Sequence, residues 1–228
     1  MTTLGKPHLH YATLGSTNDR ARELAAAGAA SGTIVTADEQ TAGRGRRGRS
    51  WQTPPGQALL LSVLLREAPE LLTLRVAVAA AGACGDQAQI KWPNDILIGG
   101  LKIAGILCEQ QPGEDWAVAG IGVNVAVEPE ALPPELRDSA GTLGRDKADI
   151  GPFRDQFLDQ LDGALELNRH DLIDQWRARD ALAAQRVEWN GGTGTAAGID
   201  VDGRLLVDVG AEQVALDAGE VSLVRPAD

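Results

Sequence analysis

Residues 89–125, QIKWPNDILIGGLKIAGILCEQQPGEDWAVAGIGVNV, say more about the fold class than any other stretch of this sequence. Four short apolar runs lie within it, at 89–92, 96–98, 102–108 and 116–125. Runs of this length and composition are typical of β-strands. Gly99-Gly100, between the second run and the third, indicates a two-residue hairpin. We therefore predict that neighbouring strands of a sheet form here.

Strands and helices both flank this stretch. Three earlier strands are predicted at 8–14, 33–37 and 58–65, the last as an apolar run covered on both faces. Four segments have helical patterns: one opened by Ser16-Thr17-Asn18-Asp19 and stopped by Gly28, then 71–84, 153–168 and 171–184. The Pro- and Gly-rich segment 128–151 is interpreted as a surface connection. The fold class predicted is α+β, a mixed β-sheet with flanking helices.

The character of the chain changes after Gln185. Residues 186–228 alternate apolar and polar side chains between glycine-containing turns, which predicts four or five short strands in a small β-barrel-like module. About 43 residues are too few to hold together comfortably alone, so the module is expected to dock on the larger domain. We predict two domains, 1–184 and 185–228.

Composition excludes several classes of protein. The chain has 228 residues and a formal net charge of −11, and its acidic balance argues against general nucleic-acid binding. No apolar run approaches the roughly 18 residues that a membrane span needs. The N-terminal residues lack the basic-then-apolar order of a secretory signal. Cys84 and Cys108 are expected to be buried free thiols in a reducing compartment.

The most informative site motif is GRGRRGRSW, residues 43–51, which places four arginines and three glycines within residues 43–49. Adjacent guanidinium groups repel each other, so packing alone does not explain them. Arginine makes planar, bidentate contacts with anions, and glycine lets the backbone approach a ligand. We interpret the segment as a mobile loop that closes over a phosphate. A solvated basic loop or a nucleic-acid patch is the alternative.

Two other motifs fail on mechanism. Gly43-x-Gly45-x-x-Gly48 matches the dinucleotide-binding fingerprint, but that motif must open a helix. The residues that follow it, SWQTPPG at 50–56, cannot form one. His8 and His10 could face the same side of a strand and share a metal, but no third clustered ligand accompanies them. No metal ligands are assigned.

The motif KWPND, residues 91–95, follows a predicted strand. Proline is expected to end the strand and to aim Asn94 and Asp95 away from the sheet. A plain turn is the alternative, because Pro-Asn-Asp is common turn chemistry. A turn leaves Lys91 and Trp92 unexplained.

Three further segments each have a plain structural alternative. Strict alternation puts Lys102 on one strand face with Ala104 and Ile106, where it could equally be a lysine snorkelling at a strand end. Two glycines in GIGVN, residues 120–124, weaken a strand unless something approaches it closely, and Asn124 adds a polar group. Ser16-Thr17-Asn18 could simply cap a helix.

Taken together, these segments resemble biotin–protein ligases in identity, order and spacing. In chain order the segments are Ser16-Thr17-Asn18, Gln40, GRGRRGRSW (43–51), KWPND (91–95), KIAGIL (102–107) and GIGVN (120–124). The resemblance runs from about Tyr11 to the end, where residues 219–223 are similar to the family's last strand. It implies a class II synthetase-like biotin–lipoate ligase catalytic domain plus a small C-terminal SH3-like β-barrel. Some bacterial members add an N-terminal winged-helix domain and act as repressors. This chain begins almost at the catalytic domain, so no DNA-binding role is expected.

The resemblance implies a two-step ligation. Biotin reacts with ATP, with Mg²⁺ on the triphosphate, to give biotinyl-5′-AMP and pyrophosphate, and a lysine of a carrier protein then takes the biotin. The implied catalytic residues are Lys102 and Arg46. The implied biotin-binding residues are Ser16, Thr17, Asn18, Gln40, Arg44, Gly45, Arg46 and Lys102. The implied ATP- or adenylate-binding residues are Arg47, Arg49, Trp51, Lys91, Asn94, Asp95 and Asn124.

The family also implies the partners. The expected carrier is a biotin carboxyl carrier protein domain of an acyl-CoA or pyruvate carboxylase, and the enzyme is expected in the cytoplasm, without DNA or membrane partners, as a monomer or homodimer. Two rival functions stay open. Lipoate–protein ligases are similar in fold and reaction, but their motifs differ. A non-catalytic module could use the arginine-rich segment 43–51 for RNA, which leaves KWPND, Lys102 and GIGVN unaccounted for.

Overall fold

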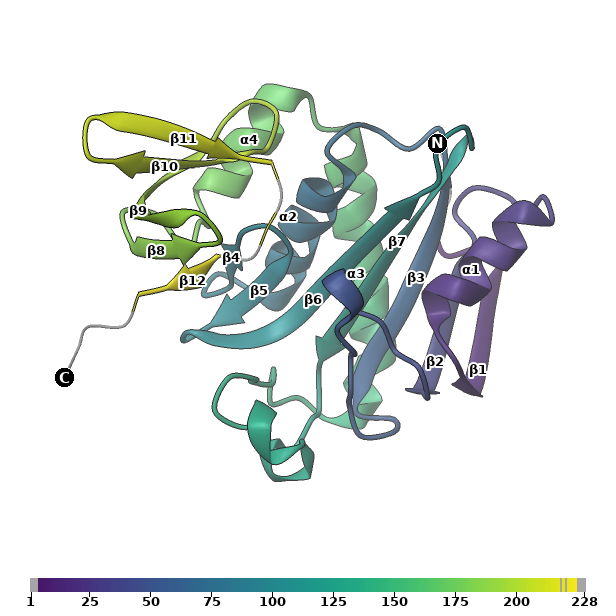
Figure 1. Cartoon of the computed structure of the whole chain (residues 1–228). Helices are drawn as coiled ribbons and strands as arrows, with labels where there is room; N and C mark the ends of the chain where they lie inside the picture. The colour runs from purple at the N-terminus through teal and green to yellow at the C-terminus, as the bar shows by residue number, and fades with distance from the viewer. Residues whose placement is uncertain (1–3, 218, 220, 225–228) are drawn as a thin grey trace.

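The computed structural model describes residues 4–217, 219 and 221–224, and its largest element is a seven-stranded sheet (Figure 1). The strands are β1 (His8–Leu14), β2 (Ile34–Gln40), β3 (Ala58–Arg66), β4 (Gln89–Lys91), β5 (Asp95–Ile98), β6 (Leu101–Gln110) and β7 (Trp116–Asn124). Their order is β1-β2-β3-β7-β6-β5-β4. β1 and β2 are parallel and the other neighbours are antiparallel, which confirms the predicted mixed sheet.

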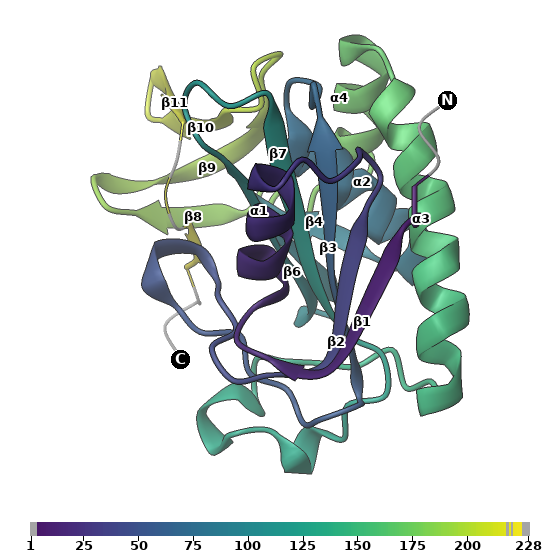
Figure 2. The same cartoon turned by 90° about the vertical axis from the view of Figure 1, so that its right-hand side faces the viewer.

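Helices cover both faces of this sheet. α1 (Thr17–Ala26) lies against β2, β3 and β7, whereas α2 (Leu72–Cys84) covers the opposite face with α3 (Ile150–Glu166) packed on it, and α4 (Arg169–Arg177) also contacts α2 (Figure 2). β3 is buried along almost its whole length, because alternate side chains enter apolar clusters on the two faces of the sheet. This confirms a strand covered on both faces. The site described below lies on the α1 face.

The predicted hairpin joins β5 to β6. Gly99 and Gly100 have φ values of 58° and 80°, the left-handed conformation that a two-residue turn of this kind requires. The prediction that Lys102 shares a face with Ala104 and Ile106 is wrong. A register shift pairs Lys102 with Leu97 although Asp95 pairs with Gly105, so Lys102 lies on the same face as Gly105.

Two other segments differ from the prediction. Within 128–151 lie three single-turn 3₁₀ helices, Pro129–Ala131, Pro134–Leu136 and Lys147–Asp149. This segment is more than a surface connection, because the backbone N–H of Lys102 donates to Ser139 O at 2.8 Å. The last helix stops at Arg177 instead of 184. Residues 179–181 pair with Ile90 of β4 instead, which satisfies backbone groups of an edge strand.

The C-terminal module is a five-stranded antiparallel sheet. Its strands are β8 (Arg186–Trp189), β9 (Gly192–Ile199), β10 (Leu205–Val209), β11 (Glu212–Leu216) and β12 (Ser222–Leu223), in the order β11-β10-β9-β8-β12. Glu220 of the predicted last strand lies outside the described residues. The module packs on the larger part of the chain, because Val187, Ile199 and Leu205 belong to the same apolar core as α2 and α3. A domain boundary at 184/185 stays a prediction.

The two cysteines are free. Cys84 is buried at the end of α2 and Cys108 lies half-buried in β6, and burial raises the pKa of each thiol to about 12. Protonated thiols of this kind behave as small apolar groups and react slowly. No helix within the described ranges has the length and apolar character that crossing a membrane would require.

Candidate functional site

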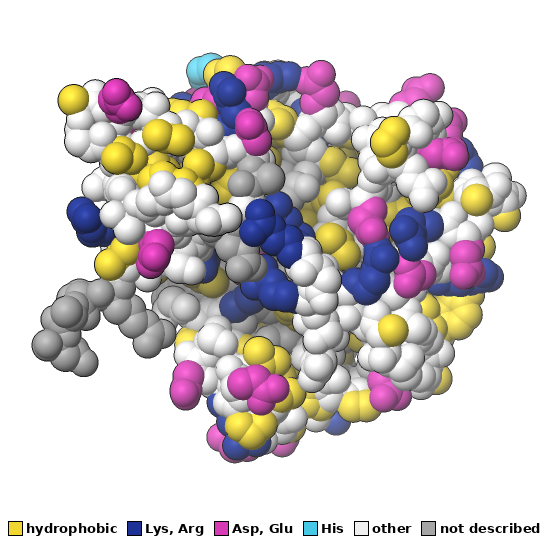
Figure 3. All heavy atoms as spheres, viewed as in Figure 1, with side chains coloured by type: hydrophobic (Ala, Val, Ile, Leu, Met, Phe, Trp, Pro, Cys, Tyr) yellow, Lys and Arg dark blue, Asp and Glu magenta, His cyan; other side chains and the backbone are white. Residues whose placement is uncertain are grey.

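A cavity of about 590 Å³ opens on the α1 face of the sheet. Its walls come from the first turn of α1, the arginine loop (residues 43–51), β5 to β7, the segment 132–140 and β12. Lys and Arg side chains gather around a hollow in the middle of this face (Figure 3). The predicted site residues that line the cavity are Ser16, Thr17, Asn18, Gln40, Arg44, Gly45, Arg46, Arg49, Trp51, Lys91, Asn94, Asp95, Lys102 and Asn124.

The Asn18 amide is fixed at one end of the cavity. Its Nδ2 donates to Leu107 O at 3.0 Å and to Glu109 Oε2 at 2.8 Å. Its Oδ1 accepts from Ser62 Oγ at 2.6 Å, and the residue is buried. Both amide protons are therefore committed within the protein, and Asn18 can offer a ligand only the remaining lone pair of its oxygen.

Thr17 and Gln40 complete this polar end. Gln40 Oε1 accepts from the Thr17 backbone N–H at 2.7 Å and from Thr17 Oγ1 at 3.0 Å. Because its oxygen is committed, Gln40 can present its amide nitrogen to a ligand as a donor. Ser16 occupies the N-cap position of α1, but its side chain makes no capping hydrogen bond. This end of the cavity thus combines neutral donors with neutral acceptors.

Glycines in β6 and β7 make room for the site. A Cβ built on Gly120 would lie 2.0 Å from Asn18 Oδ1, and one on Gly122 would lie 2.5 Å from the Trp51 ring. Gly105 faces the same indole, at 2.8 Å. Two different side chains therefore sit where a larger residue would have its Cβ, which confirms the close approach expected of the GIGVN glycines.

The charged centre of the cavity is Lys102. Its Nζ lies 2.7 Å from Asp95 Oδ1 and 5.6 Å from the centroid of the Trp51 ring. The register shift in β6 brings this ammonium to the cavity face of the sheet. An ammonium flanked by one carboxylate and one aromatic ring can exchange its partner for an incoming anion.

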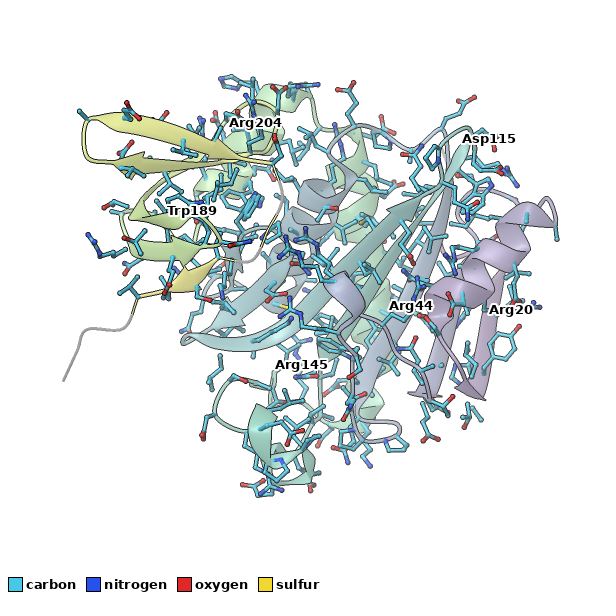
Figure 4. All side chains as sticks on the ribbon, in the orientation of Figure 1. Arg20, Arg44, Asp115, Arg145, Trp189 and Arg204 are labelled. Carbon is cyan, nitrogen blue, oxygen red and sulfur yellow. The ribbon has the colours of Figure 1, made fainter. Side chains whose placement is uncertain are left out.

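The four arginines of the loop do not share one role. Arg44 lies beside α1 (Figure 4) and forms ion pairs with Glu109 and, at 3.4 Å, with Asp19. Arg46 Nη1 lies 3.4 Å from Asn94 Oδ1, and Arg49 lines the cavity. Arg47 does not line it.

Backbone geometry accounts for the different course of Arg47. Its φ of 56° is in the left-handed region, which a residue with a side chain adopts rarely. Arg47 Nη2 lies 3.9 Å from the position of a Cβ built on Gly219, so the side chain reaches toward the C-terminal module. Ser222 and Leu223 of that module line the cavity as well.

The two asparagines expected near a nucleotide have different hydrogen bonds. Asn94 does not point away from the sheet, because its Nδ2 donates to Ile106 O at 2.9 Å and its backbone carbonyl accepts from Ile106 N–H at 2.9 Å. Asn124 Nδ2 donates to Gly141 O at 2.8 Å. Its Oδ1 is buried and has no hydrogen-bond partner among the described residues, so it is a free acceptor in the cavity wall.

Sequence reasoning missed several contributors. Ser62 and Glu109 hold Asn18, and Asp19 holds Arg44. Ser62 carries a signal, since it is the single polar residue inside the apolar run 58–65. The segment 132–140 carries no such signal in its sequence, because its contact with β6 forms only in the folded chain.

The two histidines of β1 do not form a metal site with their neighbours. His8 Nε2 and His10 Nδ1 both contact Thr36 Oγ1, at 2.7 and 3.0 Å, and burial lowers the pKa of His8. Within the part of the chain that the structure describes, no three His, Cys, Asp or Glu side chains are grouped as metal ligands.

Comparison with known proteins assigns similarity along nearly the whole chain. The family model described as "Biotin/lipoate A/B protein ligase family" matches residues 11–126, and the one described as "Biotin protein ligase C terminal domain" matches residues 186–224. The biotin--[acetyl-CoA-carboxylase] ligase of Mycobacterium tuberculosis is 34% identical over 236 residues, which cover 94% of this chain and 88% of that protein.

Two further matches differ in coverage. The bifunctional ligase/repressor BirA of Bacillus subtilis is 42% identical over 154 residues, 62% of this chain, and the match spans about half, 47%, of that protein's length. The structure of biotin protein ligase from Aquifex aeolicus in complex with biotin and ATP superposes with a TM-score of 0.80 at 27% identity, covering 96% of this chain and 99% of that one.

Proposed function

The chain belongs to the biotin/lipoate A/B protein ligase family, and from this premise we propose that it is an ATP-dependent biotin–protein ligase. The observation that carries the proposal is the single cavity that joins a neutral polar end, around Asn18, to a cationic centre at Lys102. Biotin has the same two parts, a neutral ureido ring and a carboxylate. Similarity to a ligase that holds biotin and ATP supports the assignment.

The polar end matches the ureido ring. That ring has one carbonyl oxygen, which accepts hydrogen bonds, and two N–H groups, which donate them. Gln40 Nε2 and Ser16 Oγ can donate to the carbonyl, while Asn18 Oδ1 and Thr17 Oγ1 can accept from an N–H. No charged group is needed at a neutral ring. Arg44, the cation beside this end, is paired with Glu109 and Asp19, and Lys102 lies at the charged centre of the cavity.

The first step brings two anions together. A carboxylate oxygen of biotin attacks the α-phosphorus of ATP, a P–O bond forms, the bond to the β-phosphate oxygen breaks, and pyrophosphate leaves. Lys102 Nζ would exchange Asp95 for the carboxylate and an α-phosphate oxygen, which stabilises the crowded phosphorus centre. Arg46 and Arg49 would contact the phosphates, and Asn124 Oδ1 would accept a hydrogen bond from the nucleotide.

We include Mg²⁺ as an ion carried by the triphosphate. Magnesium usually keeps several waters and takes one or two protein carboxylates beside phosphate oxygens. Asp95 and Asp138 are the carboxylates that line the cavity, so the residues present fit such an ion. When bound, it would neutralise charge on the leaving pyrophosphate.

The second step transfers biotin to the carrier. A lysine amine attacks the acyl carbon of biotinyl-5′-AMP, a C–N bond forms, the C–O bond to AMP breaks, and a proton leaves the nitrogen. The arginine loop and Trp51 would limit access of water to this reactive anhydride. The name of the mycobacterial relative supports a carrier domain of acetyl-CoA carboxylase. Two free thiols, one buried and one half-buried, support a reducing, cytoplasmic location.

Two assays test the proposal. Isotope exchange between pyrophosphate and ATP should depend on biotin and not on lipoate, which separates the two branches of the family. Mass spectrometry of a biotin carboxyl carrier domain incubated with the protein, biotin and MgATP should show one added biotinyl group. Exchange driven by lipoate alone, or an unmodified carrier, would overturn the proposal. Steeply salt-dependent RNA binding without ATP turnover would favour the polyanion-binding alternative.

A further inference from the structure

We propose that Glu109 is a positioning residue for this reaction, whose carboxylate orients the Asn18 amide and anchors the arginine loop through Arg44. The inference rests on the proposed function. Glu109 does not line the cavity, whereas Asn18 and Arg44 do. Its influence on a ligand would therefore pass through these two neighbours.

The Glu109 carboxylate fixes the orientation of the Asn18 side-chain amide. A side-chain amide can turn by half a rotation, which exchanges its oxygen and nitrogen. Ser62 cannot choose between the two orientations, since a hydroxyl both donates and accepts. The Glu109 carboxylate only accepts, so its 2.8 Å contact requires Nδ2, and Leu107 O agrees with it. Oδ1 is thereby kept toward Gly120 and the cavity.

Glu109 also holds the arginine loop through an ion pair with Arg44. Arg44 pairs with Glu109 and Asp19, and Arg22 pairs with the same two acids, at 2.6 Å from Asp19 and 3.8 Å from Glu109. Two cations and two anions thus alternate, and the group as a whole is neutral. The charge of Arg44 is committed to protein carboxylates, which distinguishes it from a phosphate-gripping arginine.

Arg44 stands at the base of the loop. Its backbone forms a bridge with Ser50, and the Trp51 N–H donates to Gly43 O at 2.9 Å, so both ends of the loop are joined there. Holding Arg44 therefore fixes the point from which Arg46, Arg49 and Trp51 extend over the cavity. The Glu109 side chain is only 24% exposed, which leaves the pair less screened than a surface ion pair.

The experiment compares Glu109→Ala, Glu109→Gln and the control Glu23→Ala. Glu23 forms a surface ion pair with Arg20, 2.7 Å long and away from the cavity. Biotin KM, ATP KM and kcat are measured by pyrophosphate exchange, the release of biotinyl-AMP by rapid filtration, and stability by urea unfolding. Glu109→Gln keeps an oxygen that can accept from Asn18 but loses the charge that holds Arg44, so it separates the two contacts.

We expect Glu109→Ala to raise the biotin KM about 10–100-fold, with a smaller change in ATP KM, because a charge-assisted contact is lost. Glu109→Gln should raise the biotin KM less, and should still speed adenylate release. The double variant Glu109→Gln/Arg44→Gln should release the adenylate about as fast as either single variant, since both changes break the same ion pair. Glu23→Ala should match wild type.

If both Glu109 variants kept the wild-type biotin KM and the wild-type rate of adenylate release, the inference would be overturned and the proposed function would stand. If biotin KM and ATP KM rose by the same factor, kcat fell by that factor and the unfolding midpoint fell as well, Glu109 would be merely structural. That result would also overturn the inference. A wild-type protein without biotin-dependent exchange would overturn the proposed function, and the inference with it.

Discussion

The change Gly120→Ala tests whether the polar end of the cavity depends on the close approach of Asn18. The added Cβ would lie 2.0 Å from Asn18 Oδ1, so the amide must retreat by about 1.4 Å to reach an ordinary contact of 3.4 Å. Its three hydrogen bonds, at 2.6, 2.8 and 3.0 Å, cannot survive such a movement.

The magnitude follows from these bonds. Three net contributions of about 0.5–1.5 kcal/mol each are lost, and replacing a strand glycine by alanine returns about 0.5–1 kcal/mol. The free energy of unfolding should fall by about 2 kcal/mol, which corresponds to about 4–8 °C in Tm for a chain of this size. Biotin loses its contact with Asn18 as well, and its Kd should rise at least about tenfold.

Titration calorimetry with biotin and differential scanning calorimetry measure the two effects. Gly163→Ala is the matched control, since Gly163 lies in α3 and, apart from the backbone of its own helix and its chain neighbours, nothing lies within 4 Å of the added Cβ. The control should leave biotin binding unchanged and stabilise the fold by about 0.5–1 kcal/mol, because glycine is a poor helix former. If Gly120→Ala bound biotin as tightly as wild type, the role given to Asn18 would be wrong.

Four other changes probe separate parts of the molecule. Lys102→Ala should reduce pyrophosphate exchange about 10²–10³-fold with an unchanged unfolding midpoint, and near-normal exchange would remove Lys102 from the mechanism. Arg46→Gly should speed the release of biotinyl-AMP about tenfold in a filtration assay, and unchanged retention would contradict the closing role of the loop. Arg75, buried in α2, donates to four backbone carbonyls, three of them at the end of α3, so Arg75→Met should lower the free energy of unfolding by about 2–4 kcal/mol in urea titrations. Burial raises the pKa of Asp180 above its ordinary 3.8, so the folded protein binds this proton more tightly and loses stability as pH rises from 3.8 through the raised value. Asp180→Asn should therefore gain stability relative to wild type across that range, whereas a pH-independent difference would refute the argument.

Much of the fold could be predicted because its strands are apolar runs between turn residues. The Gly99-Gly100 hairpin and the buried run of β3 depend on local sequence alone, and the structure confirms both. The end of α4 could not be predicted. Residues 178–184 have helical composition, but β4 is an edge strand and pairs with residues 179–181 instead. Backbone hydrogen bonds with a strand distant in the sequence outweigh the local helix propensity of these residues.

The candidate site shows the same division. The motifs could be read from their residue types, and they meet in one cavity. The sheet face on which Lys102 lies could not be predicted, because a register shift of one residue reverses the strict alternation of side chains. The contact of Glu109 with Asn18 spans 91 positions of the chain, and nothing near Glu109 in the sequence announces its partner.

Trp92, which a plain turn did not explain, has a structural purpose. Its buried indole donates to Gly203 O at 3.0 Å, and Gly203 lies against Leu71 and Leu74 at the start of α2. The KWPND motif therefore fastens the C-terminal sheet to the body of the protein only two positions before Asn94. Trimming the chain after residue 184 would strip the cover from Trp92 and from the adjoining apolar surface. Proteolysis between the two parts should therefore not release two stable fragments. A relative that received this C-terminal sheet by grafting would need a tryptophan at the position of Trp92 to hold it.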